Sequence, residues 1–199
     1  MSDSWYKVDN VAKVFLATAS QRDPRVFRIS CTLNEEIDPD TLNEALRSTA
    51  QEWPQFQVTL HRGLFWHYFE STDQLPTAQP ETKAPCAPLY TPERRNKLIY
   101  RVTYCGARIN LEMFHAITDG NGGLLYLKSI VRNYLALRHP GEMENVPSPN
   151  SASAGDMAQD SFRNFYEGTK RKKPAEKPKV YHPHGFLPYS QLQFFEGHL

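Results

Sequence analysis

The sequence predicts an α+β domain, an α/β two-layer sandwich in which a mixed, largely antiparallel sheet carries helices packed on one face. Two observations support this prediction. Short segments with the residue pattern of strands occur at 26–33, 58–61, 64–70, 98–104 and 110–114, and those at 26–33 and 98–104 alternate clearly between apolar and polar residues. Two longer segments repeat apolar residues at helical spacing, at 39–52 and 123–138.

The first strong signals are a strand followed by a helix. Residues 26–33 alternate strictly between apolar and polar side chains, which predicts a half-buried strand. Asp38 then occupies an N-cap position with Pro39 at the first helical position, and helical spacing continues to residue 52. Pro54 ends this helix because proline disfavours helical dihedrals in the residue before it.

The middle of the chain predicts a hairpin, an irregular segment and a second pair of strands. Residues 58–61 and 64–70 flank a Gly63 turn, and the aromatic run LFWHYF predicts a hairpin packed on both sides. Residues 71–95 contain five prolines and little periodicity, so they form an irregular excursion across the surface. The strands at 98–104 and 110–114 are joined by a turn at Gly106.

The last predicted helix, 123–138, is amphipathic and is ended by the sequence His-Pro-Gly at 139–141. We therefore expect one domain over residues 1–139. A linker with a short helix and a basic run follows at 140–189. The alternating residues 190–199 either pair backward with the main sheet or form the first strand of a missing second half, and the second alternative is the one we expect.

Composition excludes several classes of protein. The chain has 199 residues, of which 40% are hydrophobic, and a formal net charge of +1. Near-zero net charge argues against a dedicated binder of nucleic acid or of an anionic membrane, because both need a surplus of positive charge. The apolar stretch at 11–19 is interrupted by Lys13 and Thr18, so it predicts neither a signal peptide nor a membrane span.

The three cysteines predict reduced thiols in a cytoplasmic protein. Cys31, Cys86 and Cys105 are odd in number, widely spaced and free of any zinc-type pattern. His182 and His184 resemble half of a metal site, but no third ligand clusters with them in the sequence. We therefore expect no metal.

The segment FHAITDGNGG at 114–123 is the strongest chemical signal, since it stands between an apolar strand and an amphipathic helix. A histidine at the end of a strand has a fixed backbone, and its near-neutral pKa suits proton transfer. Asp119 follows four residues later as a turn residue or helix cap, and Gly120 offers the positive φ that such a turn often needs. The three residues at 121–123 are interpreted as a flexible turn.

These residues resemble the signature His-x-x-x-Asp-Gly of the superfamily of chloramphenicol acetyltransferase, alcohol acyltransferases and the condensation domains of peptide synthetases. The chain is most similar to bacterial alcohol acetyltransferase-like proteins. The order of the segments VFRISCTL, RGLFWHYFE, LIYRVTYCG and LLYLKSIVRNYL also resembles the N-terminal half of such enzymes. The resemblance covers residues 7–138 and implies a chloramphenicol acetyltransferase-like half domain.

The resemblance implies transfer of an acyl group, expected to be acetyl, from a thioester to an alcohol or amine. His115 would be the general base, Asp119 would order the loop by pairing with an arginine such as Arg28 or Arg101, and Gly120 would close the turn. Acyl-CoA or an acyl carrier would be the donor, and no cofactor would be tightly bound. A second acyltransferase half or self-association would complete the site.

Two alternatives remain beside this hypothesis. One is an amide-forming condensation-type fragment, although Phe114 stands where condensation domains usually carry a second histidine. The other is a non-catalytic binding or assembly module that retains the scaffold. An enzyme requires a His115 ring that faces a solvent channel with one nitrogen free, whereas in a module the ring would be covered by packing.

Overall fold

The computed structural model describes residues 5–63, 66–91 and 94–142. Its elements, in chain order, are β1 (Trp5–Lys7), α1 (Asn10–Thr18), β2 (Val26–Thr32), α2 (Pro39–Glu52), the 3-10 turn η1 (Pro54–Phe56), β3 (Val58–Arg62), β4 (His67–Ser71), β5 (Gln79–Pro80), β6 (Tyr100–Cys105), β7 (Arg108–Phe114) and α3 (Gly120–Arg138). The expected strand at 190–199 and nearly all of the expected linker lie outside the described residues.

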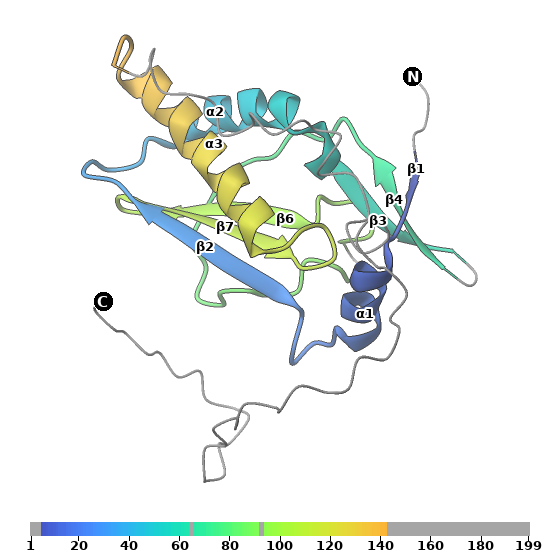
Figure 1. Cartoon of the computed structure of the whole chain (residues 1–199). Helices are drawn as coiled ribbons and strands as arrows, with labels where there is room; N and C mark the ends of the chain where they lie inside the picture. Colours follow the sequence, from blue (N-terminus) through green and yellow to red (C-terminus); the bar gives the residue numbers. More distant parts are fainter. Residues whose placement is uncertain (1–4, 64–65, 92–93, 143–199) are drawn as a thin grey trace, which may run out of the picture. The chain divides into compact units, whose positions relative to one another are not determined.

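A four-stranded sheet with the order β2-β7-β6-β5 forms the centre of the fold. β7 pairs antiparallel with both β2 and β6, and only the short β5 is parallel to its neighbour. Both α2 and α3 cover one face of this sheet (Figure 1). Ile109, Leu111 and Met113 alternate along β7 and are fully buried beneath these helices. The predicted α+β class and one-sided helix layer are therefore confirmed.

The two helices are held to each other and to the sheet by a few specific polar contacts within an apolar core. Asp38 caps α2 by accepting a hydrogen bond from the Thr41 backbone N–H at 2.9 Å, as the sequence predicts. The hydroxyl of Tyr134 in α3 accepts from the Asp38 N–H at 2.9 Å. The buried Trp53 indole donates to Ser129 Oγ at 2.9 Å, so its polar atom is satisfied inside the core.

A second, three-stranded antiparallel sheet has the order β1-β4-β3. Thr59 of its strand β3 forms an isolated bridge with Leu98, two residues before β6 begins. This sheet packs around a second core cluster, which consists of Val8, Ala12, Val58, Leu60, Leu89, Ile99, Phe114 and Ala116. Helix α1 contributes Ala12, which is only 3% exposed. Two of these core residues, Phe114 and Ala116, flank His115.

The structure corrects several boundaries. Neither β1 nor α1 was predicted, because β1 is exposed throughout and α1 buries only one residue, so neither has a clear periodic pattern. The hairpin of β3 and β4 is present, but Trp66 is 60% exposed, so its aromatic run is not packed on both sides. Helix α3 begins at Gly120, three residues earlier than expected.

Among the described residues, Cys31, Cys86 and Cys105 are free thiols. The described part holds no group of three or more metal-ligating side chains. None of its helices combines the length and the apolar character that a membrane crossing requires.

Candidate active site

His115 is the first residue after β7 and stands where the two core clusters meet. Its backbone N–H donates to the carbonyl oxygen of Arg25 at 2.8 Å, one residue before β2 begins, so the β2–β7 pairing holds its backbone. Phe114 and Ala116 on either side are buried in the second cluster. The His115 side chain is half-buried. The strand end therefore fixes this histidine, as the sequence predicts.

Two aromatic rings from other elements contact the His115 imidazole. Phe15 of α1 is stacked on it, with ring centroids 4.2 Å apart and planes 8° from parallel. Phe27 of β2 lies 4.9 Å away at an angle of 56°. No described residue hydrogen-bonds a ring nitrogen of His115. One ring face is thus covered while both nitrogens are without a partner in the described part of the chain.

Asp119 is the N-cap of α3. Its Oδ1 accepts a hydrogen bond from the Gly122 N–H at 2.8 Å, and its side chain is exposed. The expected ion pair of Asp119 with Arg28 or Arg101 is wrong, because both arginines bind Glu112 instead. The helix-cap interpretation of Asp119 is the one that the geometry supports, and a cap satisfies a backbone N–H that has no partner within the helix.

The expected left-handed conformation of Gly120 is also wrong. Gly120 is the first residue of α3, and the glycines with positive φ in the described chain are Gly106 and Gly141. An added Cβ at Gly120 would meet nothing within 4 Å, whereas at Gly123 it would lie 2.8 Å from Phe27 Cε2. The segment at 121–123 is therefore not a flexible turn. It is the first turn of α3, and Gly123 lets this helix approach the Phe27 ring, which in turn contacts His115.

An ionic cluster centred on the buried Glu112 lies on the side of β7 opposite the helices. The Glu112 carboxylate is fully buried, and it accepts from Arg28 Nε and Arg101 Nε, each at 2.9 Å, and from the Cys86 backbone N–H at 2.8 Å. Arg28 also pairs with Glu81, whose second oxygen accepts from Arg108 Nη2 at 2.6 Å. No local signal in the sequence indicated that these residues meet.

These contacts control the protonation of the carboxylates. Burial alone would raise the pKa of Glu112, but the Cys86 N–H and the two guanidinium groups outweigh it and hold that pKa below its usual value. Hydrogen bonds from Arg28 and Arg108 likewise lower the pKa of Glu81. Both carboxylates are therefore ionised at neutral pH. Their two negative charges compensate most of the positive charge of the three arginines in the cluster.

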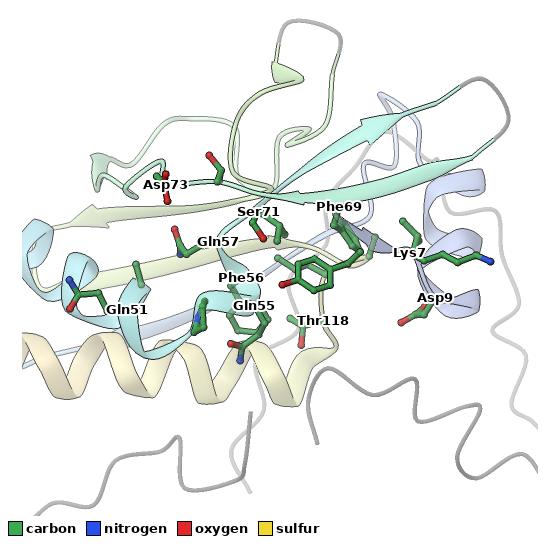
Figure 2. A pocket seen from close by; sticks show the side chains of 18 of the residues that line it. Lys7, Asp9, Gln51, Gln55, Phe56, Gln57, Phe69, Ser71, Asp73 and Thr118 are labelled. Atoms are coloured by element: carbon green, nitrogen blue, oxygen red, sulfur yellow. The ribbon is translucent and has the colours of Figure 1, made fainter. Parts of the chain in front are cut away.

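The residues after His115 line a groove of about 970 Å³. Ala116, Ile117 and Thr118 form part of its wall, although His115 is not among the lining residues. Apolar side chains such as Phe56 and Phe69 alternate with polar ones, and Figure 2 shows Gln51, Gln55, Gln57 and Asp73 among its labelled residues. The sequence did not predict this groove, because its wall combines four separated segments, at 6–13, 50–58, 69–75 and 116–118.

Gln57 is a polar residue of the groove that is anchored to the core. Its Nε2 donates to the hydroxyl of Tyr100 at 2.7 Å, and Tyr126 donates to the same oxygen at 2.9 Å. Burial raises the pKa of Tyr100 to about 12, so the phenol stays neutral and the network carries no charge at physiological pH.

The described chain has the fold of part of a condensation domain, as the sequence resemblance implies. No family model and no curated protein matches the chain. Among solved structures, it is similar to polyketide synthase associated protein 5 from Mycobacterium tuberculosis, at 14% identity over 71% of this chain and 35% of that chain, with a TM-score of 0.52.

Two further solved structures have the same fold. A variant of the starter condensation domain of rhizomide synthetase RzmA in complex with C8-CoA matches at 12% identity over 67% of this chain and 36% of that chain, with a TM-score of 0.54. The X-domain from teicoplanin biosynthesis matches at 14% identity over 64% of this chain and 31% of that chain, with a TM-score of 0.52. The chain thus spans about a third of the length of the structures it matches.

Proposed function

We propose that this protein takes part in acyl transfer from a thioester to an alcohol or amine, with His115 as the general base. The observation that supports this most directly is the place of His115 in a condensation-domain fold. It directly follows a buried strand, its ring nitrogens have no partner among the described residues, and the next three residues line a groove large enough for a substrate.

The proposed reaction needs one proton acceptor. A nitrogen of His115 removes the proton from the acceptor hydroxyl or amine as its oxygen or nitrogen forms a bond to the thioester carbonyl carbon. The tetrahedral intermediate then collapses with cleavage of the carbon–sulfur bond. The imidazolium returns the proton to the departing thiolate, so the products are the ester or amide and a free thiol. Positioned proton transfer of this kind contributes about 10²–10⁴-fold to a rate.

We propose acyl-CoA as the donor, with acetyl-CoA as the first candidate and no tightly bound cofactor. A similar structure that holds C8-CoA supports a CoA thioester. Because the chain spans about a third of its structural relatives, we propose that a second acyltransferase half or a second copy completes the substrate channel. In this proposal Asp119 orders the loop as a cap of α3.

The test is a transfer assay with acetyl-CoA and a panel of short alcohols and amines, in which the released thiol is measured. We expect His115→Ala to lower kcat by at least 100-fold. His67→Ala is the matched control, since His67 opens β4 and does not line the groove. Ser71→Trp at the exposed end of β4 should fill the groove and raise KM. Equal rates for wild type and His115→Ala would refute the proposal.

One observation favours a second candidate, a binding module without catalysis. Phe15 covers a face of the His115 ring, as expected for a histidine that serves only packing. In that case wild type and His115→Ala release thiol only at the same background rate, and His115→Ala instead lowers stability. The acceptor panel also separates the condensation-type alternative, because an amide-forming domain would prefer the amines.

A further inference from the structure

Helix α1 reaches the candidate general base although the two are about a hundred residues apart in the sequence. Phe15, in the second half of this helix, is half-buried and is the residue whose ring is parallel to the His115 imidazole, at 4.2 Å between centroids. Its neighbour Val14 is 60% exposed. Phe15 is therefore directed inward, and its position depends on how α1 is anchored.

The anchor of α1 is the same core that holds the histidine. Asp9 caps the helix by accepting from the Ala12 N–H at 2.6 Å. Ala12 is buried in the second core cluster together with Phe114 and Ala116, the two neighbours of His115. The helix and the strand end thus share one packed cluster, so Phe15 and His115 have a fixed spatial relation.

A second aromatic ring restricts the imidazole as well. The Phe27 ring lies 4.9 Å from the imidazole, and behind it Gly123 of α3 leaves no room for even one added carbon, since a Cβ there would lie 2.8 Å from the Phe27 ring. Phe27 cannot retreat toward α3. A rotation of the His115 side chain would therefore have to displace either Phe15 or Phe27.

We propose that Phe15 is a positioning residue for His115, which holds the imidazole in one orientation and leaves only its edge, with the nitrogens, open to a substrate. The inference rests on the proposed general-base function. It extends that function to the first helix of the chain. The π-face of Phe15 also attracts the positive charge that the imidazole acquires when it takes a proton, so the stacking persists through the reaction.

The test begins with proton NMR of the imidazole C–H groups, which a stacked aromatic ring shifts upfield. The chain has seven histidines, and the His115 signals are assigned by their loss in His115→Gln. We expect Phe15→Leu, which keeps an apolar side chain but removes the ring, to move these signals downfield. Phe15→Tyr should leave them in place, and Val14→Leu on the exposed side of the same helix should change nothing.

Kinetics of the same variants measure what the orientation contributes. We expect Phe15→Leu to lower kcat by about 10-fold to 100-fold with little change in KM. Phe15→Tyr, which keeps an aromatic ring, should have the kcat of the wild type. Circular dichroism shows whether each variant is folded. His115 signals that Phe15→Leu leaves unmoved, or that move while kcat stays at the wild-type value, would overturn the inference. Failure of the proposed function has a different signature, namely transfer that His115→Ala does not slow.

Discussion

Two glycines of the motif region should respond in opposite directions to the same substitution. Gly120 is the first residue of α3, is exposed, and has open space where a Cβ would be added. Gly123 lies one turn later, where an added Cβ would lie 2.8 Å from Phe27 Cε2 and 3.3 Å from Ile29 Cδ1. Each is tested by a single change to alanine.

The expected magnitudes follow from these surroundings. Gly120→Ala reduces the entropy of the unfolded chain at no steric cost, and should raise the free energy of unfolding by about 0.4–1 kcal/mol. Gly123→Ala gains about 1 kcal/mol of helix propensity. It also forces the Phe27 ring to move in a packed core, which costs about 1–3 kcal/mol. Gly123→Ala should therefore lower the free energy of unfolding by about 0–2 kcal/mol in all, and the unfolding free energies of the two variants should differ by about 0.4–3 kcal/mol.

Denaturant unfolding of both variants measures this difference, and the proton NMR spectrum of His115 shows whether the displaced Phe27 ring disturbs the imidazole. We expect Gly123→Ala to shift the His115 signals and Gly120→Ala to leave them unchanged. The reasoning would be refuted if Gly120→Ala were the more destabilising of the two. That result would mean that the motif glycine needs a conformation that alanine cannot adopt.

Three further changes test the surroundings of the site by denaturant unfolding. Asp119→Ala should cost about 1 kcal/mol through loss of the α3 cap while Asp119→Asn costs much less, and equal losses would show that the charge matters instead. Glu112→Gln should cost about 3–5 kcal/mol, because Arg28 and Arg101, both half-buried, lose the charge of the fully buried carboxylate between them. Ser129→Ala should cost about 1–3 kcal/mol, since the buried indole N–H of Trp53 loses its acceptor; a neutral result would mean that water replaces it.

Glu112 also predicts how stability depends on pH. Its pKa in the folded protein lies below the usual glutamate value of 4.5, so the unfolded state binds the proton more readily. The stabilisation is therefore complete above pH 4.5 and is lost as the pH falls through the lower folded value. Unfolding free energies measured from pH 6 to pH 3 should fall more steeply for wild type than for Glu112→Gln. Parallel curves would contradict this assignment.

The regular elements could be predicted where burial is one-sided and the caps are local. The strand at 26–33 and the helix that begins after Asp38 are examples, since alternation, an N-cap and a proline all lie within a few residues. Helix α1 could not be found in this way. It is short, both Val11 and Val14 are exposed, and its apolar residues contact a core formed by distant strands.

The candidate site was predictable to a smaller extent. The motif located His115 and Asp119, but the roles of the glycines depend on how close α3 comes to β2, which no local pattern contains. The expectation from the sequence is that Asp119 pairs with Arg28 or Arg101. In the structure, Glu112 on the neighbouring strand lies directly opposite both arginines. Asp119 lies in the loop before α3 and cannot compete with Glu112 for these arginines. Strand pairing already places the Glu112 carboxylate opposite the two guanidinium groups, so no other part of the chain has to be ordered to form the ion pairs.

That cross-strand row also links the ionic cluster to the position of His115. Arg28, Glu112 and Arg101 lie opposite one another across β2, β7 and β6. A slip of β7 by one residue would turn Glu112 toward the apolar core under α2 and α3, and a slip by two would separate the carboxylate from both arginines. Either slip would also break the hydrogen bond from His115 to Arg25 and move the imidazole away from Phe27. A buried ion pair adds little net stability compared with apolar packing, but it penalises wrong registers heavily. We therefore infer that the cluster sets the register that places the histidine.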